Sequence, residues 1–103
     1  MEGQNKQQEL QALEQSLQNI LMQKQSFQME LKETDSALKE LENSGEEVYK
    51  VVGQLMVKTD KSSMKKELEE KKQETESKIK SLENQESSIS QKVESLRNEI
   101  VGK

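Results

Sequence analysis

The sequence predicts a mainly α-helical protein, a long antiparallel coiled-coil hairpin with a two-stranded β-hairpin at the helix-connecting end. Two long segments carry apolar residues at alternating intervals of three and four, which is the pattern of a coiled-coil seam. The chain contains no proline that would interrupt a helix. A short segment between the two helical ones is rich in β-branched residues. We expect the whole chain, residues 1–103, to form one domain.

The composition excludes a thick globular core and several kinds of chemistry. Charged residues make up 35% of the chain and hydrophobic residues 29%, so most positions must face water. Cysteine and histidine are absent, which excludes disulfides and ordinary structural zinc sites and fits a reducing compartment. We therefore expect no cofactor and no metal, and a cytoplasmic location.

Membranes and nucleic acids are not expected partners. The N-terminal segment lacks the apolar centre of a signal peptide, and no apolar run reaches membrane-spanning length. The net charge is −4, and the lysines near residues 65–72 alternate with glutamates, as on a solvated helix face.

The first helix is predicted over residues 9–43, preceded by a frayed polar segment. Asn43-Ser44-Gly45 should end it, with Gly45 as the C-terminal cap. Eight of its ten seam positions are apolar: Leu10, Leu13, Leu17, Ile20, Lys24, Phe27, Leu31, Thr34, Leu38 and Leu41.

The second helix is predicted over residues 61–101. The segment 59–63 offers several possible N-caps, and the sequence does not choose among them. Seven of its ten seam positions are apolar: Leu68, Lys72, Thr75, Ile79, Leu82, Glu86, Ile89, Val93, Leu96 and Ile100. Lys78 lies off the seam and is expected to be a solvated side chain.

Residues 48–59 are predicted to form the β-hairpin. Gly53-Gln54 suits a type II′ turn, which pairs Val52 with Leu55 and Val51 with Met56. Both faces then carry apolar groups, and an isolated hairpin of this size is marginal in water. We therefore expect strands of other subunits to complete the sheet. The expected assembly residues are Val48, Tyr49, Val51, Val52, Gly53, Leu55, Met56 and Val57.

Two charged residues, Lys24 and Glu86, occupy seam positions. Antiparallel registers that fill the seam place them within about one helical turn of each other. They could form an ion pair that fixes the register at some cost in stability. Alternatively, both side chains reach out to water and only interrupt the seam.

The hairpin and the two matched seams together resemble the β-type subunit of prefoldin, as found in archaea. The family pattern has an aromatic residue and a lysine, then a glycine, then alternating aliphatic residues ending in a basic one. It falls on Tyr49, Lys50, Gly53, Leu55, Val57 and Lys58. The α type has two hairpins, and this chain has room for one.

The resemblance implies an ATP-independent holdase. Hairpins of six subunits, two α-type and four β-type, would join in a double β-barrel between subunits, and six coiled coils would extend from it. The tips of the coiled coils would hold unfolded client proteins and deliver them to a group II chaperonin.

Apolar residues toward the chain ends are the candidates for client binding. Helix ends fray, so the ends of the seam can open and expose them. The candidates are Leu10, Leu13, Leu17, Ile20, Leu21, Met22, Val93, Leu96, Ile100 and Val101.

The sequence also bears on two other classes of function, an enzyme and a structural coiled coil. An enzyme is not expected, because the chain has no His, no Cys and no Gly-rich phosphate loop. The alternative is a structural or tethering coiled-coil protein without chaperone activity, in which the β segment is only a kinked connector. That protein would associate through its helices, whereas the chaperone subunit would associate through its strands.

Overall fold

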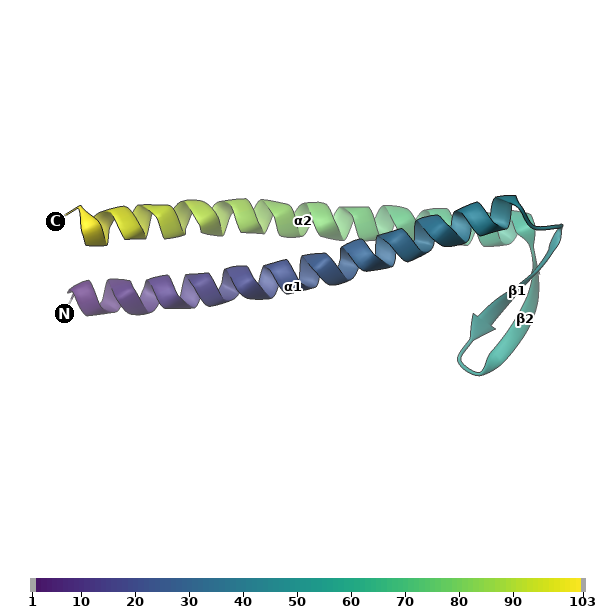
Figure 1. The fold of residues 1–103 in the computed structure, drawn as a ribbon, viewed down its shortest axis with the longest axis horizontal. Coiled ribbons are helices and arrows are strands. Elements are labelled where there is room, and N and C mark those ends of the chain that lie inside the picture. The colour runs from purple at the N-terminus through teal and green to yellow at the C-terminus, as the bar shows by residue number, and fades with distance from the viewer. Residues whose placement is uncertain (1, 103) are drawn as a thin grey trace. The chain divides into compact units, whose positions relative to one another are not determined.

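The computed structural model describes residues 2–102, with side chains from residue 5 onward. Helix α1 (Glu2–Glu42) is followed by strands β1 (Glu47–Val52) and β2 (Leu55–Asp60) and by helix α2 (Lys61–Val101), as Figure 1 shows. The two strands form one antiparallel sheet. This arrangement confirms the predicted fold class, two long helices with a two-stranded hairpin between them.

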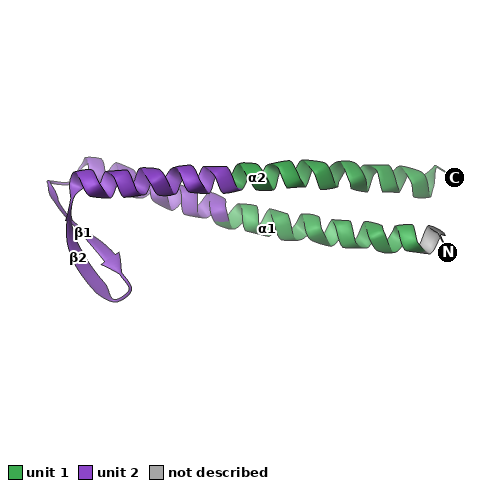
Figure 2. Ribbon diagram, turned by 180° about the vertical axis from the view of Figure 1, so that it is seen from behind, with its two compact units in different colours: residues 1–26, 79–103 green, residues 27–78 purple. Residues whose placement is uncertain are grey.

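The chain divides into two compact units, coloured separately in Figure 2. Unit 1 combines residues 1–26 with residues 79–103, and unit 2 consists of residues 27–78. Each unit contains a segment of α1 and a segment of α2. None of the described helices is long and apolar enough to cross a membrane.

Unit 1 is a pair of antiparallel helical segments held by the apolar seam. Ile20, Leu82, Val93 and Leu96 are buried, and the other predicted seam residues of this unit are half-buried. Ion pairs flank the seam: Lys6 Nζ lies 3.6 Å from Glu99 Oε2, and Arg97 Nη2 lies 2.5 Å from Glu14 Oε2. The segments are thus joined by burial of apolar surface along the seam and by charge pairs at its edges.

In unit 2 the seam contains two buried threonines, Thr34 and Thr75, and the buried Leu41. Thr34 Oγ1 donates to the carbonyl of Glu30 in its own helix, at 2.9 Å, so this hydroxyl is buried without losing a hydrogen bond. Every predicted seam position of unit 2 is buried or half-buried, as in unit 1. The seam prediction is therefore confirmed in both helices.

Charged side chains also pair across the helices of unit 2. Lys72 Nζ lies 3.0 Å from Asp35 Oδ1, and this hydrogen bond together with the carboxylate charge raises the pKa of Lys72. Lys78 is exposed as expected, but its ammonium lies 5.3 Å from the centroid of the Phe27 ring. The expectation of a merely solvated lysine was therefore incomplete, because the aromatic side chain offers a cation–π contact.

Helix α1 begins at Glu2, seven residues earlier than the predicted start at residue 9. Residues 4–8 are mostly glutamine and lysine, which favour helix, and extending an existing helix by one residue is far easier than starting one. The predicted start of the first helix at residue 9 was therefore wrong.

The predicted cap at Gly45 was also wrong. Such a cap needs a positive φ, and Gly53 alone has one among the described residues. Instead, Ser44 Oγ donates to the carbonyl of Leu41 at 2.7 Å. Lys61 Nζ donates to the carbonyls of Glu42 at 3.1 Å and Ser44 at 3.2 Å. A positive charge at the carbonyl end of a helix also interacts favourably with the helix dipole.

The N-cap of α2 is Asp60. Its Oδ1 accepts a hydrogen bond from the backbone N–H of Ser63 at 2.7 Å, and its Oδ2 accepts one from the Ser63 hydroxyl at 3.1 Å. The bond from the Ser63 N–H, followed by that from its hydroxyl, lowers the pKa of Asp60. Asp60 thus resolves the choice that the sequence left open among residues 59–63.

Candidate functional site

The turn of the hairpin is built on Gly53. Its φ is +61°, and no described residue other than glycine has a positive φ, so Gln54 is in the ordinary region. This combination is that of a type II′ turn, because a type I′ turn requires a positive φ at both central residues. The turn sets a register that pairs Val52 with Leu55, and the pairing continues to Glu47 with Asp60. The predicted turn and register are confirmed.

The two faces of the hairpin have different surroundings. Lys50 forms an ion pair with Glu67 of α2, so its face is turned toward the helix of its own chain. Val48 and Thr59 on this face are half-buried. The opposite face carries Tyr49, Val51 and Met56, with 58%, 70% and 70% of their surface exposed.

Exposed apolar residues of the hairpin are not limited to the face of Tyr49, Val51 and Met56, which we call the open face. At the tip, Val52 is 51% exposed and Leu55 is 69% exposed, and Val57 is 45% exposed. The sheet has two strands, so each strand has one edge whose backbone groups have no strand beside them. The predicted assembly residues thus lie together on one small sheet with two open edges, the kind of surface that takes up further strands.

The seam charges Lys24 and Glu86 are in direct contact in unit 1. Lys24 Nζ donates to Glu86 Oε1 at 3.0 Å and lies 3.9 Å from Glu83 Oε2. Their side chains are only 18% and 27% exposed. Of the two alternatives that the sequence left open, the geometry is that of a partly buried pair between the helices.

The candidate client-binding residues all belong to unit 1, but they are not equally accessible. Leu21, Met22 and Val101 are exposed, at 41%, 69% and 82%. Leu10, Leu13, Leu17 and Ile100 are half-buried in the seam. Ile20, Val93 and Leu96 are buried. The seam residues can therefore meet another molecule only where the two helical segments separate or along the edges of the seam.

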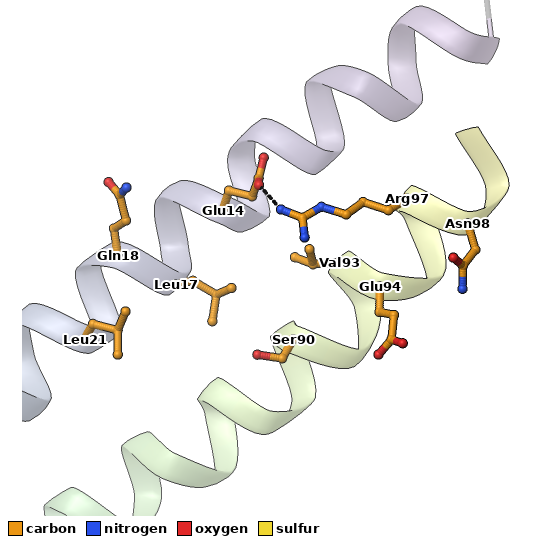
Figure 3. A pocket seen from close by; sticks show the side chains of 9 residues that line it. All are labelled: Glu14, Leu17, Gln18, Leu21, Ser90, Val93, Glu94, Arg97 and Asn98. Carbon is orange, nitrogen blue, oxygen red and sulfur yellow. Dashed lines mark hydrogen bonds and ion pairs between the residues drawn. The ribbon is translucent and has the colours of Figure 1, made fainter. Parts of the chain in front are cut away.

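A shallow, open groove of about 610 Å³ follows one edge of this seam. Leu17 and Leu21 of α1 and Val93 of α2 supply its apolar part, and Arg97 reaches across to Glu14 at one end (Figure 3). The remaining lining residues are polar: Gln18, Ser90, Glu94 and Asn98.

The sequence pattern predicts Leu17, Leu21 and Val93 as candidate binding residues but does not predict the polar lining of the groove. In the heptads that the seam defines, Glu14 and Arg97 occupy e positions, which flank a coiled-coil seam, whereas Gln18 and Glu94 occupy b positions further from it. The heptad pattern therefore marks Glu14 and Arg97 as flanking residues, but not Gln18 and Glu94. Which of them meet across the helices depends on the axial register, which the sequence did not determine.

The described residues contain no cluster of three or more His, Cys, Asp or Glu side chains arranged to bind a metal ion. The pKa values of two described residues are shifted, those of Asp60, an N-cap, and Lys72, an ion-pair partner. Their causes are structural, so the shifts point to no acid–base chemistry.

Comparison with known proteins agrees with this fold. A sequence model described as "Prefoldin subunit" matches residues 4–103. The structure is similar to the crystal structure of the prefoldin beta subunit from Thermococcus strain KS-1, with a TM-score of 0.89 and 38% sequence identity. That match covers 96% of this chain and 89% of the other. No curated protein sequence matches the chain significantly.

Members of the matched family are chaperone subunits that form hetero-oligomers, and they are not enzymes. The family match covers both helices and the hairpin, and the structural match agrees with it in fold. The chain therefore belongs to the prefoldin family and has the fold of its beta subunit.

Proposed function

We propose that this chain is the β-type subunit of an ATP-independent holdase, which captures unfolded proteins and delivers them to a group II chaperonin. The observation that carries the proposal is the exposed hairpin. Its open face presents Tyr49, Val51 and Met56 to solvent, and a folded monomer rarely leaves such an apolar sheet uncovered. We regard residues 1–103 as a single prefoldin β-like domain of the cytoplasm.

Assembly would proceed by addition of strands to this hairpin. Each open edge offers backbone N–H and C=O groups in the spacing of a β-ladder, and the apolar faces would be buried as the sheet closes. A closed barrel removes open edges altogether. We propose a hexamer of two α-type and four β-type subunits, in which Val48, Tyr49, Val51, Val52, Gly53, Leu55, Met56 and Val57 supply this chain's share of the barrel.

Client capture is proposed for unit 1. Unfolded chains expose apolar segments of no fixed sequence, so a holdase needs apolar groups that adapt to many partners. Leu21, Met22 and Val101 are exposed without any rearrangement. Seam residues such as Leu13 and Ile100 become available when the ends of the helices open, which needs little free energy at a helix terminus.

The tethering coiled coil is the competing function, and the exposed hairpin argues against it. A connector that only links two helices has no use for apolar residues on an exposed face, and Val51 and Met56 are each 70% exposed. The seams, which a tethering protein would offer to a partner helix, are already occupied by the chain's own helices.

The function can be tested by the aggregation of a chemically denatured protein after dilution, followed by light scattering without ATP. The complex of this chain with an α-type prefoldin subunit should suppress the scattering in proportion to its concentration. It should then release the client to an added group II chaperonin, and the yield of native client should rise. No suppression at a several-fold molar excess of the complex would contradict the proposal.

A further inference from the structure

The groove along the seam of unit 1 has three apolar lining residues, Leu17, Leu21 and Val93, which form its apolar floor and differ in solvent exposure. Val93 is buried, Leu17 is half-buried and Leu21 is 41% exposed. All three side chains point into the space between the helical segments (Figure 3). An apolar side chain of another molecule could contact Leu17 and Leu21 here without separation of the helices.

The opposite edge of the same seam differs. A second groove there is lined by Leu96 as its one apolar residue, and Leu96 is buried. Its other lining residues are polar or charged: Glu9, Ser88, Gln91, Lys92, Ser95 and Glu99. The accessible apolar floor is therefore a property of one edge, and only this edge is suited to hold an apolar side chain.

The charge of the apolar groove is negative. Arg97 pairs with Glu14 at one end, with Nη2 and Oε2 2.5 Å apart. Glu94 also lines the groove, and none of the ion pairs among the described side chains includes it. The three charged residues of the lining, Glu14, Glu94 and Arg97, therefore give the groove a net charge of −1, because Arg97 offsets Glu14 and no ion pair of the described side chains offsets Glu94.

The rest of the lining consists of neutral hydrogen-bonding groups. Gln18, Ser90 and Asn98 are exposed and carry amide or hydroxyl groups that can both donate and accept. Backbone N–H and C=O groups of an extended chain need such partners, because no secondary structure satisfies them. The groove is also shallow and open. It is therefore better suited to bind an extended polypeptide segment than a small molecule, which usually needs an enclosed pocket.

We propose that this groove binds an extended segment of an unfolded chain that places a basic side chain next to an apolar one. The apolar side chain would contact Leu17 and Leu21, and the basic side chain would pair with Glu94. This inference rests on the proposed holdase function. It adds a preference in the captured segment: cationic apolar segments are favoured over anionic ones of equal hydrophobicity.

The test uses the complete complex with an α-type subunit and three short fluorescent peptides of equal length. Each peptide carries the same leucines, flanked by lysines, glutamines or glutamates. Fluorescence anisotropy should rank the affinities as lysine, then glutamine, then glutamate. Each step should be about two- to fivefold, the size expected for a solvent-exposed ion pair.

The ranking must depend on Glu94. Glu94→Gln should reduce the differences among the peptides, and Glu94→Lys should reverse their order. The matched control is Glu74→Lys, an exposed glutamate of the same helix in unit 2, which should leave the order unchanged. Native mass and helix content of each variant verify that it folds and assembles.

Two results would overturn the inference. If Glu94→Lys leaves the ranking unchanged, the charge of the groove does not select the segment. If the three peptides bind equally to the unaltered complex, capture depends on hydrophobicity alone. In both cases, suppression of aggregation by the unaltered complex would leave the proposed holdase function standing, whereas loss of suppression would contradict that function itself.

Discussion

Two consecutive residues, Asp60 and Lys61, build the corner between the hairpin and the helices. Asp60 caps the N-terminus of α2 through Ser63, and Lys61 Nζ donates to the carbonyl of Glu42, the last residue of α1, and to that of Ser44 just after it. The backbone N–H of Lys61 also donates to the carbonyl of Glu46 at 3.0 Å. The first residue of α2 therefore supplies hydrogen-bond donors to carbonyl groups at and just after the end of α1. These bonds hold the hairpin and the adjoining helix ends of unit 2 together.

The Asp60 cap predicts a specific dependence of stability on pH. The native pKa of Asp60 lies below its ordinary value of 3.8, so the cap stabilises the fold fully above that value. Its contribution is lost as the pH falls through the native pKa. Asp60→Ala should lower Tm by a few degrees at neutral pH, whereas Asp60→Asn should retain most of the cap.

Thermal melts followed by circular dichroism at neutral pH and at a pH of about 2 would check this. The difference in Tm between the natural chain and Asp60→Ala should shrink in acid, while that between Asp60→Asn and Asp60→Ala should persist. An equal difference in Tm between the natural chain and Asp60→Ala at both values would show that the Asp60 carboxylate does not stabilise α2.

The pair of Lys24 and Glu86 predicts a coupling between two positions far apart in the sequence. Each single replacement by Leu leaves a partly buried charge without its partner, and the double replacement restores an apolar layer. The double variant should therefore be more stable than the sum of the singles predicts, by about 0.5–3 kcal/mol.

Denaturant unfolding of the four proteins measures this coupling free energy. The more exposed pair Lys71–Glu30, at 3.7 Å, is a matched control and should couple by less than about 1 kcal/mol. Additive effects at Lys24 and Glu86 would mean that the contact does not contribute to the register.

At the scale of elements, the helices and the hairpin could be predicted because their signals are local. Alternation by three and four located both seams, and Gly53 located the turn with its register. The end of α1 could not be predicted in the same way. It is satisfied by Lys61, whose position beside Glu42 and Ser44 results from the fold of the hairpin rather than from any local pattern.

The candidate site could be predicted only in its apolar part. Leu17, Leu21 and Val93 follow from periodicity, but the groove also depends on Arg97 meeting Glu14 across the helices. That contact requires the axial offset of two antiparallel helices, and several offsets bury a seam almost equally well. The seam pattern alone therefore did not reveal the charge of the groove.

The hairpin predicts that assembly fails when charge is placed on its faces. Val51 and Val57 lie on opposite faces, so replacing both by Asp puts an unpaired charge on each side of the sheet. The double variant should lose the oligomer almost completely while helix content changes little. Sedimentation velocity and circular dichroism measure the two effects.

The matched control for that variant is Val101→Asp, the same kind of replacement at an exposed valine outside the hairpin. It should leave the oligomer intact. Retention of full oligomer mass by the variant with Asp at both hairpin positions would place the assembly interface on the helices and favour the tethering protein.

At the scale of the whole molecule, the proposal separates assembly from capture. Deleting residues 1–17 and 94–103 should leave the hexamer intact and strongly reduce suppression of aggregation, because several subunits contribute weak contacts that multiply through avidity. Polar replacement of Leu13, Leu17, Leu96 and Ile100 should act in the same direction.

Light scattering of a denatured test protein measures the loss of protection, and native mass confirms the hexamer. Gln23→Ser is a suitable control, because Gln23 is exposed in unit 1. Lys78 would be a poor control, since it stacks on Phe27. Full protection by the truncated hexamer would move client capture to the hairpin or to the remaining helix flanks.

The mass of the complex formed with an α-type prefoldin subunit tests the central claim most directly. Native mass spectrometry of the mixture should show one species with two α-type subunits and four copies of this chain. The same chain with Asp at positions 51 and 57 should yield no such species. A mixture in which this chain stays monomeric, or pairs only with itself and ignores the α-type subunit, would contradict the account.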